Sequence, residues 1–307
     1  MRHRRVQRGR GDEELFETEA GNTLAYRYTK PSTLAGTHAP TLVFETGMFA
    51  TDVHWAWYRQ FLGDKYKILT YSRAGYGRSE FSSRNPFTLS AAVSDLRDLI
   101  RHCCQAEPVV LVGHSVGGFL AMRAAELLPG SIQGLVMIDP SHPGQLLRSK
   151  AQIKGAEKLG FHLSLMPEST KLGLGSLLDV PSWVSSLPED EQRLCRDQFR
   201  DWKVWKTAKR EWTEVRREFL SHDGSLPKIG FPALLIAADR TRLDDTTTVE
   251  LHDELAAAAM HGRVEVIDNC GHLEVLVEKA SANQATGHID TFIRNLNEDA
   301  YDKEEKR

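Results

Sequence analysis

Ser115 is the side chain best placed to act as a nucleophile, because it stands at the centre of a Gly-His-Ser-Val-Gly sequence at residues 113–117. The β-branched run before it, 108–112, predicts a buried strand, and the apolar pattern after it, 116–128, predicts a helix. A sharp turn from strand to helix strains the residue at the turn, and flanking glycines remove the clashes that larger side chains would cause. The pattern therefore predicts a serine hydroxyl exposed at the tip of a strand.

His272 is the candidate base for this serine. A serine hydroxyl is a poor nucleophile unless a base lies within hydrogen-bond reach. Of the twelve histidines, His272 follows Gly271 just after the last predicted strand, at 263–267, and precedes a helix predicted at 282–296. Ser115 and His272 together indicate acyl-transfer chemistry.

The elements that must position these residues alternate along the chain between strand and helix. Such alternation is typical of a parallel sheet wrapped by helices. We expect strands at 24–28, 41–44, 67–71, 108–112, 132–138, 233–237 and 263–267, and helices at 53–62, 89–104, 116–128, 249–260 and 282–296.

The alternation stops between residues 141 and 229, where only helices and loops are expected. A segment of this length is too long for a structureless loop in a compact domain. We interpret 141–229 as a helical cap over the strand ends, roofed in part by tryptophans, and we divide the core into 1–140 and 230–297. The charged residues 298–307 are expected to form a disordered tail. The cap tryptophans are Trp183, Trp202, Trp205 and Trp212.

Three segments resemble the α/β-hydrolase family: Gly113–Gly118, Tyr71–Ser79 and Gly271-His272. The resemblance extends over about Leu15 to Asn297 and is weakest in the insertion. It implies a mostly parallel, eight-stranded sheet with helices on both faces. It also implies that the nucleophile follows the fifth strand and that the cap lies between the sixth and seventh.

The acid that orients His272 is the open member of the triad. The family carries it after the seventh strand, but Thr241 stands in that position here, and threonine has no charge to stabilise an imidazolium. Asp139, which ends the sixth strand, is our favoured acid, since some family members place theirs there. The alternative interpretation is that Asp139 has a structural role and caps the segment that follows. The loop after the seventh strand offers the alternatives Asp239, Asp244 and Asp245.

Two backbone N–H groups are expected to bind the oxyanion. Val116 follows the nucleophile directly, and Met48 lies in the loop after the third strand, where Thr46 replaces the histidine that relatives often carry. A main-chain donor survives that replacement. The remaining substrate-pocket candidates are Gly47, Phe49, His114 and His142.

The expected function is a serine esterase, lipase or lactonase that cleaves an ester or related acyl bond of a small, hydrophobic molecule. Carbon–carbon or amide hydrolysis on the same fold, or a non-catalytic ligand-binding protein, are the alternatives. Attack by aspartate, as in dehalogenases and epoxide hydrolases, is disfavoured by the serine. Neither a dinucleotide fingerprint nor a phosphate-binding loop is present, and we expect no cofactor and no metal.

Composition sets further bounds. A formal net charge of −3 and 41% hydrophobic residues give no reason to expect a nucleic-acid partner. No apolar run approaches the roughly 20 residues of a membrane span. The start, with five arginines in residues 1–10, reads as a solvated tail and lacks the apolar region of a signal peptide. Together with four cysteines lacking metal or disulfide spacing, this predicts a cytoplasmic protein, which could form a homodimer.

Overall fold

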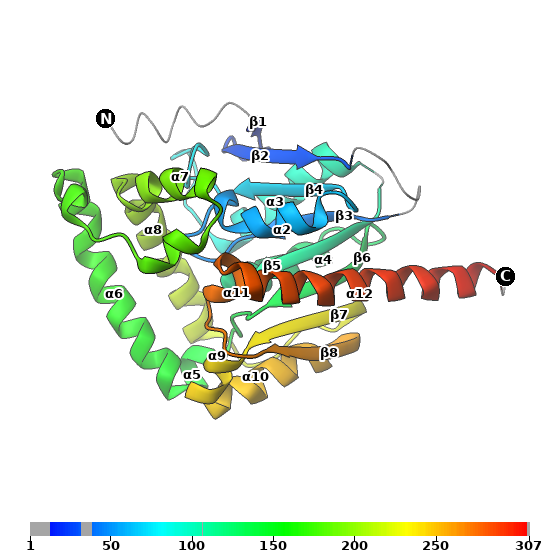
Figure 1. The fold of residues 1–307 in the computed structure, drawn as a ribbon. Helices are drawn as coiled ribbons and strands as arrows, with labels where there is room; N and C mark the ends of the chain where they lie inside the picture. Colours follow the sequence, from blue (N-terminus) through cyan, green and yellow to red (C-terminus); the bar gives the residue numbers. More distant parts are fainter. Residues whose placement is uncertain (1–12, 32–38, 106, 306–307) are drawn as a thin grey trace.

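The computed structural model describes residues 13–31, 39–105 and 107–305 and contains one eight-stranded sheet (Figure 1). The strand order is β1-β2-β4-β3-β5-β6-β7-β8. β1 pairs with β2 and β2 with β4 in antiparallel fashion, and all other neighbours are parallel. The strands are β1 (Glu14–Glu17), β2 (Thr23–Thr29), β3 (Thr41–Glu45), β4 (Ile68–Ser72), β5 (Val109–His114), β6 (Ile132–Ile138), β7 (Ile229–Ala238) and β8 (Ala259–Ile267).

This architecture confirms the predicted eight-stranded, mostly parallel sheet. Each of the seven strands expected from the sequence is present, with ends that differ by up to four residues. The sequence pattern did not reveal β1, a four-residue edge strand in which three positions are exposed, because its two apolar residues are adjacent and so short a run carries no apolar alternation.

Helices cover both faces of the sheet and enclose two apolar layers, one on each face. α3 (Leu89–Cys104) and α4 (Val116–Glu126) pack in one layer. The other contains η1 (Asp52–Trp55), α2 (Ala56–Leu62), α11 (Glu274–Val277) and α12 (Lys279–Glu305). The central strands β3 and β5 are buried along their whole length, which accounts for their continuous apolar sequences.

The regular elements between β6 and β7 are all helices, and they lie at one end of the sheet, on the left in Figure 1. Burial of one face explains these helices: α8 is strongly amphipathic and presents Val204, Ala208, Val215 and Phe219 to the core. The elements are α5 (Gln145–Arg148), α6 (Lys150–Lys171), η2 (Leu174–Leu177), η3 (Ser182–Ser186), α7 (Glu189–Phe199) and α8 (Trp202–Ser221).

Two short elements follow β7. α9 (Asp239–Asp244) occupies the loop in which the sequence left several candidate acids, and α10 (Thr246–Ala257) leads to β8. Asp245 caps α10, its side chain accepting a hydrogen bond from the N–H of Thr247.

α12 continues to Glu305 and so extends into the segment 298–307, for which the sequence suggested a disordered tail. Glu, Lys and Ala are strong helix formers, so the charged composition that suggested disorder is equally compatible with a helical extension. The arginine-rich start within residues 1–12 lies outside the described residues.

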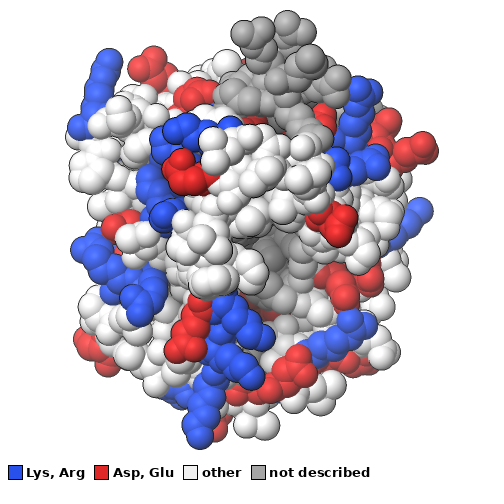
Figure 2. All heavy atoms as spheres, turned by 90° about the vertical axis from the view of Figure 1, so that its left-hand side faces the viewer, with Lys and Arg blue, Asp and Glu red and all other residues white. Residues whose placement is uncertain are grey.

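The face that carries the helices between β6 and β7 mixes Lys and Arg with Asp and Glu, and neither sign dominates it (Figure 2). Among the described helices, none combines the length and apolar character needed to cross a membrane.

Candidate functional site

Ser115 stands at the junction between β5 and α4, as the sequence predicted, and its backbone is strained, with φ of 56° and ψ of −128°. The glycines beside it are required by close backbone contact. A Cβ on Gly113 would lie 2.4 Å from the carbonyl oxygen of Gly117. A Cβ on Gly117 would lie 2.4 Å from the carbonyl oxygens of Glu45 and Thr46. The elbow therefore packs directly against the loop that follows β3.

That loop brings Met48, one of the two expected oxyanion donors, to the serine, and the other, Val116, follows Ser115 directly at the start of α4. A Cβ on Gly47 would lie 3.1 Å from Cβ of Ser115, so the two segments touch beside the hydroxyl. Within the described part of the chain, the N–H groups of Met48 and Val116 have no protein acceptor. Both residues line the same cavity as Ser115, so two unpaired donors are available beside the candidate nucleophile.

His272 and Asp139 form a hydrogen bond of 2.6 Å between Nδ1 and Oδ2. The Asp139 side chain is fully buried, whereas that of His272 is 49% exposed at the cavity. Burial by itself would raise the pKa of Asp139, but the hydrogen bond and charge interaction with His272 outweigh it and lower the pKa to about 2. Asp139 is thus a carboxylate at neutral pH and can orient the imidazole through Nδ1.

Two of the three candidate acids in the loop after β7, Asp239 and Asp245, have other partners. Asp239 accepts the N–H groups of Asn269 and Cys270 at 2.6 and 2.8 Å and so ties α9 to the loop before His272. Asp245 accepts a hydrogen bond from the hydroxyl of Ser149. Asp244 lines the cavity, and neither a hydrogen bond nor an ion pair to His272 is found for it within the described residues.

His114 and His142 line the cavity but have structural contacts as well. Nε2 of His114 lies 2.8 Å from the carbonyl oxygen of His272, and since a carbonyl can only accept, Nε2 carries the proton. Burial lowers the pKa of His114 to about 3 and, with further charges nearby, that of His142 to about 4. His142 Nδ1 accepts the N–H of Gly144 at 2.9 Å.

A cavity of about 680 Å³ surrounds these residues, a volume suited to a small organic molecule. One wall is apolar and comes mainly from α6, α8 and the loop after β3. Of the four tryptophans between β6 and β7, Trp212 belongs to this wall. A second wall, which comes mainly from α9 and α10, is mostly polar. It contains Arg240, Thr241, Asp244, Asp245, Thr248 and His252.

Three residues that the sequence did not single out lie beneath the loop after β3. Arg73 is 3% exposed and forms ion pairs with Glu45 and Glu211, each 1% exposed. Burial and the charge of Arg73 act in opposite directions on Glu45, and its pKa remains above the ordinary value because burial dominates. The feature of the sequence that could have indicated this buried ion-pair group is Glu45, a carboxylate at the end of a strand that is otherwise mainly apolar.

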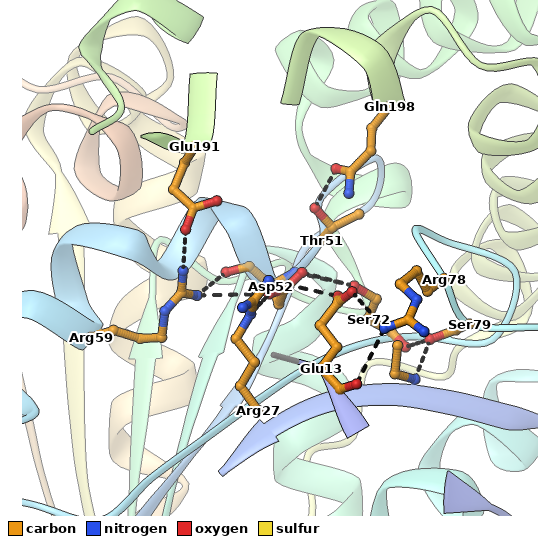
Figure 3. Close-up of polar contacts among 11 residues, drawn as sticks. Glu13, Arg27, Thr51, Asp52, Arg59, Ser72, Arg78, Ser79, Glu191 and Gln198 are labelled. Carbon is orange, nitrogen blue, oxygen red and sulfur yellow. Dashed lines mark hydrogen bonds and ion pairs between the residues drawn. The ribbon is translucent and has the colours of Figure 1, made fainter. Parts of the chain in front are cut away.

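A second polar cluster joins the helices between β6 and β7 to the residues that follow this loop (Figure 3). Glu191 of α7 reaches Nη2 of Arg59 at 3.1 Å, and Gln198 accepts the hydroxyl of Thr51 at 2.7 Å. Buried Asp52 lies at the centre and accepts Nε of Arg27 at 2.7 Å.

The sheet topology, the serine on a strained turn after β5 and the histidine after β8 define the α/β class of hydrolase fold. The family model described as "Alpha/beta hydrolase family" matches residues 42–283. The chain belongs to the alpha/beta hydrolase family.

Individual relatives are similar at low identity. The chain is 28% identical over 205 residues to "Lipase LipV" of Mycobacterium tuberculosis, covering 65% of this chain and 74% of the lipase. It is 26% identical over 207 residues to "Putative carbamate hydrolase RutD" of Agrobacterium fabrum, covering 65% and 74%. Its fold is similar to that of a thermophilic esterase from Thermogutta terrifontis, with a TM-score of 0.66, 20% identity and coverage of 92% and 98%. Family and relatives together support hydrolase activity.

Proposed function

We propose that this protein is a serine hydrolase that cleaves an ester or related acyl bond through an acyl-enzyme. The observation that carries the proposal is the hydrogen bond of 2.6 Å between His272 and buried Asp139, in the same cavity as strained Ser115. A buried carboxylate that orients a half-exposed histidine beside a serine is the arrangement that activates a hydroxyl.

In the proposed reaction, Oγ of Ser115 attacks the substrate carbonyl carbon while Nε2 of His272 takes its proton. The N–H groups of Met48 and Val116 stabilise the oxyanion of the tetrahedral intermediate. The bond to the alcohol then breaks, and the alcohol leaves with the proton from His272. Water then attacks the acyl-enzyme while His272 takes a proton from that water. The bond to Oγ of Ser115 breaks, the proton returns from His272 to Oγ, and the acid is released.

The two walls of the cavity indicate the kind of ester. Leu146, Leu159, Trp212 and Val215 form an apolar surface that suits an aliphatic or aromatic group of the substrate. Arg240, Asp244 and Thr248 lie on the other wall and suit a part of the substrate that carries hydroxyl or other polar groups. We propose that the helices α5–α8 act as a cap that closes this cavity over the strand ends.

The test is turnover of p-nitrophenyl esters with acyl chains of two to twelve carbons, by wild type and by Ser115→Ala. We expect wild type to hydrolyse at least part of the series and Ser115→Ala to lose at least about 10³-fold in kcat. Equal rates for the two proteins would refute the serine mechanism.

A fluorophosphonate probe separates the enzyme from a ligand-binding protein that has kept the fold. Labelling of wild type, absent in Ser115→Ala, requires an activated serine. A folded wild type that resists labelling would favour the binding protein. Parallel assays with a p-nitrophenyl carbamate and a p-nitroanilide would show which acyl bond is preferred.

A further inference from the structure

Two residues hold the loop that carries the proposed oxyanion donor Met48, one at each end of the loop. Both of them bind the same carboxylate, that of Glu211, which belongs to α8 in the segment between β6 and β7. Glu211 is 1% exposed. Its Oε1 accepts Nε of Arg73 at 2.7 Å, and its Oε2 accepts the hydroxyl of Tyr76 at 2.7 Å. Arg73 and Tyr76 each also form a hydrogen bond with the loop.

Arg73 binds the start of the loop. Its Nη2 donates to the carbonyl oxygen of Gly47 at 2.9 Å, and its Nη1 donates to the backbone and side-chain oxygens of Thr46. Because both carbonyls accept from one planar guanidinium, the direction of the peptide bond between Gly47 and Met48 depends on the orientation of that guanidinium. That peptide bond contains the N–H of Met48.

Tyr76 and α8 bind the end of the loop. The N–H of Phe49 donates to the hydroxyl of Tyr76 at 3.3 Å. Phe49 has a φ of 62°, a left-handed conformation that a residue with a side chain keeps when its surroundings impose it. The ring of Trp205, also on α8, packs edge-on against Phe49 at 5.0 Å between centroids.

We infer that Glu211 is a positioning residue that sets the geometry of the oxyanion hole from the cap, through Arg73 and Tyr76. Met48 lies between the two points at which this network holds the loop. The inference rests on the proposed function, because the proposed function assigns the Met48 N–H to the oxyanion hole. It adds that helices outside the sheet complete the hole, so that cap and catalytic core are coupled.

The variant that tests the inference is Glu211→Gln, which keeps the size of the side chain and removes its charge. Glu191→Gln is its matched control, because Glu191 also joins a cap helix to a core arginine, Arg59, without touching residues 46–49 (Figure 3). We expect Glu211→Gln to lower kcat about tenfold with KM changed less than about twofold. Its affinity for an alkyl trifluoromethyl ketone, which forms a tetrahedral adduct on serine, should fall in parallel. Glu191→Gln should retain the wild-type values.

Backbone amide exchange provides a readout that does not depend on catalysis. Peptides covering residues 45–50 should exchange faster in Glu211→Gln than in wild type or Glu191→Gln. Unchanged exchange there, or an equal loss of kcat in both variants, would overturn the inference. Failure of wild type to hydrolyse esters or to label would instead refute the proposed function, and the exchange measurement would still decide the inference. If Glu211→Gln does not fold, Tyr76→Phe, which removes one hydroxyl of the same network, takes its place.

Discussion

Thr241 donates a hydrogen bond of 2.8 Å to Oδ2 of Asp139, the same oxygen that lies 2.6 Å from Nδ1 of His272. The residue in the family's usual acid position therefore contacts the carboxylate that we propose as the acid. The N–H of Ala238 donates to the other oxygen at 3.0 Å, so Asp139 accepts from the strand β7 as well as from the histidine.

Asp139→Asn should lower kcat for an ester substrate about 10³- to 10⁴-fold, because an amide does not hold the imidazole in the productive tautomer or stabilise its charge. Asp239→Asn should retain most of the activity, since Asp239 binds two backbone N–H groups away from His272. Steady-state kinetics on both variants check this, and full activity in Asp139→Asn would show that another group is the acid.

Transfer of the carboxylate to position 241 should restore part of the activity. In the double variant Asp139→Asn with Thr241→Asp, the carboxylate moves to residue 241. The hydroxyl of Thr241 lies 2.8 Å from Oδ2 of Asp139, so a side chain at 241 is already close to the atom that binds His272. We expect a recovery of at least about tenfold in kcat over Asp139→Asn alone. Thr241→Asn in the same background is the control, and an equal recovery in both would argue against a charge effect.

Gly117→Ala should destabilise the protein by about 1–3 kcal/mol and reduce activity, because its Cβ would lie 2.4 Å from two backbone carbonyl oxygens. Gly287→Ala is the opposite case. Gly287 lies inside α12 with no atom within 4 Å of the added Cβ, so alanine should stabilise by about 0.5–1 kcal/mol. Urea unfolding measures both, and a stable, active Gly117→Ala would mean that the elbow packs less tightly.

The free energy of unfolding should fall as the pH falls below about 6.5, in part because of His54. Burial lowers the pKa of His54 to about 4 in the folded protein, while the unfolded chain takes up the proton near pH 6.5. Protonation therefore favours the unfolded state between these values, and His54 alone should account for about 2 kcal/mol lost between pH 7 and pH 5. Urea unfolding of wild type and His54→Gln at both pH values measures this, and an equal loss in the two proteins would contradict it.

Local residue patterns were enough to predict seven of the eight strands, the turn at Ser115 and the position of His272 after the last strand. These features depend on short stretches: a β-branched run predicts a buried strand, and glycines two residues on either side of a serine predict a sharp turn. The edge strand β1 escaped prediction because its pairing, and not its composition, makes it a strand.

The contacts of the site were decided by tertiary structure. Asp139, Thr241 and His272 lie far apart in the chain, and sequence alone left four aspartates as candidate acids. Parallel strands β6 and β7 place the first two side by side, and Asp139 accepts hydrogen bonds from both Thr241 and His272. Burial opposes the charge on Asp139, but the hydrogen bond and charge interaction with His272 outweigh burial and lower its pKa. Tertiary structure also decided the contacts of Glu211, since no local pattern relates a helix outside the sheet to the loop of Met48. Hydrogen bonds and ion pairs of this kind depend on distances in space, which packing sets and spacing along the chain does not.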